Sequence, residues 1–174
     1  MGPTHKWEEC QAIGKSFGYN RIEGPNDYKS ATELIHLLVD VVSKGGNLNL
    51  DIGPTSDGRI PAIMQERLLQ MGAWLKVNGE AIYGTHPWRQ MSEGGVHYTR
   101  AGNTVFAIAE KWPGQELALS APRTTAQTAV ELLGSQAPLE WRQEGGKLRI
   151  QVPPFPRFAL ALPEAYVFKL TGVE

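Results

Sequence analysis

Asp51 is the residue of this sequence whose type and position most suggest chemistry. It ends an alternating stretch and stands directly before Ile52, Gly53 and Pro54. A carboxylate there can act as a nucleophile, a general acid or a general base, or it can accept structural hydrogen bonds. Glu8 is a second weak candidate, because it lies in a segment that we expect to form a short strand. No local pattern joins either carboxylate to a partner, so both interpretations of Asp51 stay open.

Two aromatic residues, Phe17 and Tyr19, lie in a loop between glycines, GKSFGYNR at 14–21. An exposed aromatic ring offers an apolar face, and sugars bind against such surfaces. The alternative is that both rings simply cover the edge of the core. The loop is therefore a candidate ligand site with a structural alternative.

Other common chemistries have no support in the sequence. Lys44-Gly45-Gly46 lacks the glycine spacing of a nucleotide loop and does not follow a strand. No serine has the pattern of a nucleophile elbow around it. We expect no metal site, because no ligand spacing connects the cysteine and the histidines: Cys10, His5, His36, His86 and His97. His36 falls within an expected helix, and we interpret it as a structural histidine.

Composition excludes several classes of partner. The 174 residues carry a net charge of −1, so nothing indicates attraction to nucleic acid or to an anionic membrane. The single cysteine excludes an intrachain disulfide. No apolar run reaches the length of about 20 residues that spans a bilayer, and the first residues lack the apolar segment of a signal peptide. We therefore expect neither nucleic acid nor membrane as a partner, and the compartment stays unknown.

Two helices are predicted in the first half of the chain. Ser30 and Glu33 form a capping box, and apolar residues then recur at helical spacing at positions 34, 37, 38, 41 and 42 until Gly45. The second helix begins after Pro61, carries apolar residues at 64, 68, 71 and 75, and ends at Asn78-Gly79. Its methionine-rich face indicates core packing rather than a cofactor site.

Between these helices, residues 47–52 alternate between polar and apolar side chains. A strand between two helices is typical of a parallel sheet, and alternation fits a barrel strand whose polar row faces the interior. Functional residues of such sheets lie at the carboxyl ends of the strands. The stretch from Asp51 to Pro54 occupies that position.

The predicted secondary structure changes near Pro87, from strands that alternate with helices to strands alone. Beyond it we predict short strands, separated by glycine and proline turns, at 96–100, 104–111, 116–120, 129–133, 139–141, 147–152 and 165–171. This spacing indicates an antiparallel β-sandwich, with 153–156 as a rigid connector. Its core is expected to contain Phe106, Ile108, Trp112, Trp141, Ile150 and Phe168. The division predicted is 1–87 and 88–174.

Several long motifs resemble the α-L-fucosidases of glycoside hydrolase family 29. In chain order they are KWEEC at 6–10, SFGYN at 16–20, LVDVVSKGGN at 38–47, IGPTSDG at 52–58, QERLL at 65–69, WLKVNGEAIYG at 74–84 and FKLTGV at 168–173. The resemblance covers nearly the whole chain. It implies a retaining exo-α-L-fucosidase that acts on a fucosylated glycan or fucoside, with two catalytic carboxylates and no cofactor.

The resemblance also implies a fold, the C-terminal portion of a (β/α)8-like barrel followed by an antiparallel β-sandwich. Phe17 matches an aromatic residue that lines the family's pocket near the methyl group of the sugar. Trp7 and Tyr19 are further candidates for substrate contact, and Glu8 and Gly18 are neighbours in the same motifs. The family's strand motif usually reads NLLLNIGP, so Asn49 and Asp51 replace leucine and asparagine here.

The family's nucleophile and acid/base lie upstream of the Trp7-Glu8 motif, so we interpret the chain as truncated. One alternative is a non-catalytic carbohydrate-binding or packing module. Another is a small glycosidase whose site is rebuilt across subunits from Glu8, Glu9, Glu23 or Asp51, and a third is a chain without function by itself. Because so few elements cannot close a barrel, we expect a homo-oligomer or completion by the missing N-terminal part.

Overall fold

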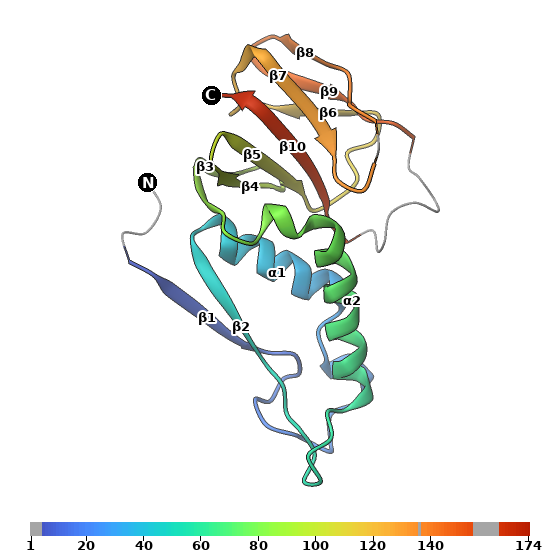
Figure 1. The fold of residues 1–174 in the computed structure, drawn as a ribbon. Coiled ribbons are helices and arrows are strands. Elements are labelled where there is room, and N and C mark those ends of the chain that lie inside the picture. The colour runs from blue at the N-terminus through green and yellow to red at the C-terminus, as the bar shows by residue number, and fades with distance from the viewer. Residues whose placement is uncertain (1–4, 136, 155–163) are drawn as a thin grey trace.

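The computed structural model describes residues 5–135, 137–154 and 164–174 (Figure 1). A parallel pair of strands and two helices come first, and antiparallel sheets follow. The elements of the first half are β1 (Trp7–Ala12), η1 (Pro25–Asp27), α1 (Ala31–Ser43), β2 (Gly46–Asp51), α2 (Ala62–Asn78) and η2 (Gly79–Ala81). Those of the second half are β3 (His86–Glu93), β4 (Val96–Ala101), β5 (Thr104–Ala109), β6 (Glu116–Leu119), β7 (Thr124–Leu132), β8 (Trp141–Glu144), β9 (Lys147–Gln151) and β10 (Tyr166–Val173).

β1 and β2 form a two-stranded parallel sheet connected through α1. Their register runs from Trp7 opposite Gly46 to Ala12 opposite Asp51, so both strands end at the same edge. Trp7 packs on Gly46, where an added Cβ would lie 2.5 Å from the indole ring. This unit places Asp51 at the carboxyl edge, as the sequence predicted.

The predicted capping box begins α1. Glu33 donates its backbone N–H to Ser30 Oγ at 3.2 Å, and its carboxylate accepts from the Ser30 N–H at 2.7 Å. Gly45 follows the helix with a φ of +83°, a conformation that favours glycine. The buried side of α1 includes Leu34, Ile35, Val39 and Val41. The predicted boundaries of this helix are therefore confirmed.

α2 begins directly after Pro61, and its methionine-rich side is buried. Met64, Met71 and Trp74 lie in the core, and the Trp74 indole N–H donates to the Ala165 carbonyl at 2.9 Å. The prediction that this face packs in the core is confirmed for Met64 and Met71 and wrong for Leu68, which is 36% exposed. Among the described residues, neither helix is long and apolar enough to cross a membrane.

The second half contains two antiparallel sheets. One has the strand order β3-β4-β5-β10-β7, and the other has β6-β9-β8. Their facing sides form a common core that includes Tyr98, Leu119, Leu148, Ile150 and Phe168. The seven predicted strands are present with shifted ends. The sequence prediction missed β3, because Pro87 and several polar residues interrupt the apolar alternation that indicates a strand. β3 is an edge strand, where proline is tolerated.

The predicted sandwich core was wrong for Phe106 and Ile108. Strand alternation directs these two side chains to the opposite face of the five-stranded sheet, where they pack with the helices. Trp112 and Trp141 are only partly buried beside the sandwich core, whereas Ile150 and Phe168 lie inside it. The helices, the five-stranded sheet and the three-stranded sheet thus form successive layers, and the β1–β2 pair lies against α1 (Figure 1).

The helical layer and the second half therefore share one hydrophobic cluster. It joins Leu34 and Trp74 of the helices to Phe106 and Val167 of the sheet. The division into 1–87 and 88–174 remains a prediction. Of the expected connector at 153–156, residues 155 and 156 lie outside the described part of the chain.

Candidate functional site

The carboxyl ends of β1 and β2 lead into two loops, 13–30 and 52–61, at the lower end of the molecule in Figure 1. The register sets Ala12 beside Asp51 at this edge. The Ile13 N–H donates to the Asp51 carbonyl at 3.2 Å, which extends the pairing by one residue. The first loop carries Phe17 and Tyr19, so the predicted aromatic pair and Asp51 belong to the same end of the sheet.

Polar side chains hold the Phe17 loop in a defined shape. A carboxylate oxygen of Glu23 accepts the Ser16 N–H at 2.8 Å. The Asn20 amide donates to Ser16 Oγ at 3.2 Å, while its oxygen accepts the Ile22 N–H at 3.1 Å. At Gly14 an added Cβ would lie 2.4 Å from the other Glu23 oxygen. The loop is therefore closed on itself around the Glu23 carboxylate.

Gly53 fixes this loop against the end of β2. An added Cβ at Gly53 would lie 2.4 Å from the Tyr19 nitrogen and 2.5 Å from the Gly18 carbonyl carbon. Only a glycine permits two backbones to approach so closely. The sequence prediction did not include Gly53 among the site residues, although Gly53 belongs to the motif IGPTSDG at 52–58.

Phe17 and Tyr19 are 59% and 46% exposed, so neither ring fills the core in this chain. Phe17 also lines an open pocket of about 440 Å³ together with Gly14 and Tyr28. Such a pocket falls in the size range of sites for small ligands. The loop thus presents aromatic surface at the end of the sheet, as its composition suggested.

Charged groups surround this pocket but are paired. Lys15 Nζ lies 2.6 Å from Asp27 Oδ1, and this hydrogen bond lowers the pKa of Asp27. Lys29 Nζ donates to the Ala12 carbonyl at 2.7 Å. Burial, and then the nearby charge of Glu23, raises the pKa of Tyr28. These groups shape the pocket, and at neutral pH Tyr28 stays protonated.

Trp7 lies apart from Phe17 and Tyr19. It starts β1, whereas they follow its end, and five strand residues correspond to about 16 Å. The Trp7 indole N–H donates to the Lys44 carbonyl at 3.4 Å, and its ring packs on Gly46. These contacts give Trp7 a packing role at the amino end of the strands. The structure does not bring it together with the other two aromatic candidates.

Glu8 and Asp51 are separated in the same way. Glu8 is four residues before Ala12, the partner of Asp51, which corresponds to about 13 Å along the strand. Glu8 is exposed and accepts the Asn49 amide at 3.1 Å. One oxygen of the half-buried Asp51 carboxylate is enclosed and has no hydrogen-bond partner among the described residues. The structure does not unite these carboxylates in one local pair.

The histidines are also dispersed. No group of three or more His, Cys, Asp and Glu side chains that could hold a metal occurs within residues 5–135, 137–154 and 164–174. His36 Nε2 lies 2.7 Å from the Glu164 carbonyl, in keeping with a structural role. His97 is buried between Ser43 and Glu110, away from the loops of the candidate site.

Family models match two successive parts of the chain. Residues 2–80 match the model described as alpha-L-fucosidase, and residues 89–171 match that of the alpha-L-fucosidase C-terminal domain. The tissue alpha-L-fucosidase of Homo sapiens is 45% identical over 178 residues, covering 99% of this chain and 38% of its own length. The alpha-L-fucosidase of Branchiostoma floridae is 43% identical over 175 residues, covering 97% and 39%. The chain spans about two fifths of the length of these relatives.

Solved structures give the same result. The Thermotoga maritima alpha-fucosidase in complex with fucose matches with a TM-score of 0.85 and 36% identity, over 97% of this chain and 41% of that one. Alpha-L-fucosidase isoenzyme 1 from Paenibacillus thiaminolyticus matches with a TM-score of 0.84 and 26% identity, over 100% and 44%. These matches confirm the predicted fold class, a fragment of a barrel followed by an antiparallel β-sandwich.

Proposed function

The chain belongs to the α-L-fucosidase family, and from this premise we propose that it serves as the C-terminal part of an exo-α-L-fucosidase. That enzyme hydrolyses terminal α-L-fucose from glycans. The proposal is supported by relatives that carry this name at more than 40% identity and by a related structure described in complex with fucose.

The observation that carries the proposal is the position of the Phe17 loop. The backbone contact of Gly53 with Gly18 and Tyr19 holds this loop at the carboxyl end of β2. Substrates bind at that edge in barrels of this type. The exposed Phe17 ring is suited to pack against the C–H groups and the methyl group of a fucose ring.

Retaining hydrolysis requires a nucleophile and an acid/base about 5 Å apart. Glu8 and Asp51 are set about 13 Å apart along the strands, which argues against a pair formed by these two within one chain. We therefore propose that the catalytic pair comes from polypeptide outside this chain. Asp51 remains a test site, since its enclosed oxygen has no partner in the described part of the chain.

Completion of the barrel is part of the same proposal. β1 and β2 make a sheet of two strands, whereas a closed barrel of this type has eight. Unpaired strand edges favour association with another strand. Either an upstream barrel part or further copies of this chain would cover these edges, and we propose a homo-oligomer for the chain by itself.

The second candidate function is a non-catalytic carbohydrate-binding module. The separation of Glu8 from Asp51 favours it, because the Phe17 loop can bind a sugar without a catalytic pair. For the 174-residue chain both candidates predict sugar binding without turnover, because neither places the catalytic pair in it. A site rebuilt across subunits would restore turnover and would depend on Glu8 or Asp51.

The test combines two measurements on the 174-residue chain. Calorimetry with L-fucose measures binding, and release of the aryl group from an aryl α-L-fucoside measures turnover. Phe17→Ala is compared with Tyr83→Ala, which removes another exposed ring from the η2–β3 connection. We expect fucose binding that Phe17→Ala weakens about tenfold and Tyr83→Ala leaves unchanged.

Binding without turnover supports a role in substrate binding and leaves the catalytic pair outside the chain. Turnover that is lost in Glu8→Gln or Asp51→Asn would instead establish the site rebuilt across subunits. Absence of both fucose binding and turnover in the folded chain would contradict the proposed binding role of Phe17.

A further inference from the structure

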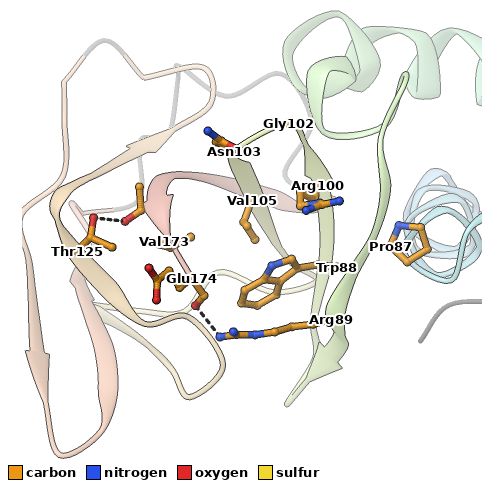
Figure 2. Close-up of a pocket in the computed structure, with 11 residues that line it drawn as sticks. Pro87, Trp88, Arg89, Arg100, Gly102, Asn103, Val105, Thr125, Val173 and Glu174 are labelled. Carbon is orange, nitrogen blue, oxygen red and sulfur yellow. Dashed lines mark hydrogen bonds between the residues drawn. The ribbon is translucent and has the colours of Figure 1, made fainter.

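A second pocket opens at the far end of the molecule from the Phe17 loop. It has a volume of about 630 Å³ and lies where β3, the β4–β5 turn, the start of β7 and the end of β10 meet. Figure 2 shows Trp88 and Arg89 on one side of it and Thr125 and Glu174 on the other. This volume suits a small organic ligand.

One wall of the pocket carries an arginine at the end of an apolar row. Val96 and Tyr98 of β4 point into the sandwich core, and by alternation Arg100 is the next residue on that side. Arg100 lines the pocket and has no hydrogen bond or ion pair within the described residues. Its guanidinium therefore keeps five donors for a ligand.

Arg89 adds a second positive charge, and its position is fixed. Its Nη2 donates to the main-chain oxygens of Ala121 at 2.8 Å and Glu174 at 2.5 Å. Its guanidinium carbon lies 4.8 Å from the centroid of the Trp88 ring, which is buried beneath the pocket. Because the protein's own main-chain oxygens engage Arg89, Arg100 is the guanidinium of this pocket whose donors stay available.

The opposite wall supplies acceptors. Thr125 Oγ1 lies 2.8 Å from the Gly172 carbonyl and accepts the Gln127 N–H at 3.2 Å, so one of its lone pairs stays available to a ligand. The Glu174 carboxylate is exposed and has no partner among the described residues. Val105 and Val173 supply apolar lining between the two walls. The pocket thus combines cationic donors, acceptors and a small apolar surface.

We propose that this pocket binds a sugar that carries a carboxylate, such as a uronic acid residue of a glycan. The carboxylate pairs with Arg100 in the bidentate geometry that guanidinium groups favour. The hydroxyl groups reach Thr125, Asn103 and Glu174, and the ring lies over Val105 and the edge of Trp88. The site is independent of the proposed fucose site and of any turnover.

The experiment is an NMR or calorimetric titration of the whole chain with four probes. D-glucuronate carries both the ring and the carboxylate, D-glucose lacks the carboxylate, and acetate and inorganic phosphate lack the ring. We expect millimolar affinity for glucuronate, because small ligands with few atoms rarely bind more tightly. Glucose, acetate and phosphate are expected to bind at least tenfold more weakly.

Arg100→Gln and Asn103→Ala probe the pocket, and Arg59→Gln is the control, since Arg59 is an exposed arginine in the loop at the opposite end. We expect Arg100→Gln to weaken glucuronate binding at least tenfold and Arg100→Lys to restore part of it. Phe17→Ala should have no effect. A thermal melt confirms that each variant is folded. Asn103→Ala changes an exposed turn and tests the site at a second residue.

Three results of the titrations with the unmodified chain would overturn the proposal. They are the absence of glucuronate binding, equal binding of glucose, and equal binding of acetate or phosphate, which would indicate a general anion site. Glucuronate binding that survives both Arg100→Gln and Asn103→Ala would likewise locate the sugar elsewhere.

Discussion

Ser43 and His97 meet across the two halves of the molecule, with Oγ and Nδ1 3.3 Å apart although 54 positions separate them in the sequence. Ser43 ends α1 and His97 lies in β4. The other imidazole nitrogen, Nε2, lies 3.0 Å from Glu110 Oε1, so both ring nitrogens have a polar partner. This buried contact joins the helical layer to the five-stranded sheet.

Removing either side of this contact should destabilise the chain. We expect Ser43→Ala or His97→Leu to lower the free energy of unfolding by about 1–3 kcal/mol, because each leaves buried polar groups without partners. Urea unfolding measures the change, and His86→Gln, at an exposed position, is the control. If Ser43→Ala and His86→Gln have equal effects, the contact does not contribute to stability.

Gly53→Ala tests the contact that holds the Phe17 loop. The new methyl group would overlap the backbone of Gly18 and Tyr19, so we expect a loss of about 1–3 kcal/mol in stability and weaker fucose binding. Gly72→Ala is a matched control, because nothing lies within 4 Å of an added Cβ there and the residue is in α2. This control should gain about 0.5–1 kcal/mol. Wild-type stability and fucose affinity in Gly53→Ala would contradict the role of this glycine.

Acid should weaken α1 through Glu33. Hydrogen bonds from the Ser30 backbone and hydroxyl lower the pKa of the Glu33 carboxyl in the folded chain. A lowered folded pKa gives a contribution that is present above the unfolded value, about 4.3, and is lost as the pH falls through the folded value. Melting temperatures measured from neutral pH down to pH 3 should fall less steeply for Glu33→Gln. Glu140→Gln, at an exposed position, should retain the wild-type slope.

The chain by itself should associate. The parallel sheet of β1 and β2 has only two strands, and Leu68 and Leu69 of α2 are 36% and 74% exposed. We expect sedimentation at micromolar concentration to show dimers or larger species, and Leu69→Lys to weaken them if α2 lies in the interface. A clean monomer in the same range would contradict the proposed homo-oligomer.

Local sequence signals predicted the elements of the first half well. The capping box of Ser30 and Glu33, the glycine at 45 and the proline at 61 each act over a few residues, so they can be read without the tertiary fold. The direction of Phe106 could not be read in this way. Both faces of β5 are apolar, and only the packed helices determine which face receives the aromatic ring.

The candidate site could be predicted in part. Phe17, Tyr19 and Asp51 were found at one end of the sheet, because glycine-flanked aromatics and a strand end are visible in the sequence. Trp7 lies away from this end because it is the first residue of β1, and its indole ring packs on Gly46 there. The contact of Gly53 with Gly18 was not predictable, since it forms between backbones of two separate loops.

The apolar residues on both faces of β5 also constrain how this architecture can change during evolution. The same strand supports the helices through Phe106 and Ile108 and the sandwich through Val105 and Ala107. A recombination event that transferred the sandwich to another protein would expose the first pair to water unless α1 and α2 moved with it. Inheritance of the sandwich together with these two helices is therefore the expected outcome, and the unit of exchange extends upstream of residue 88.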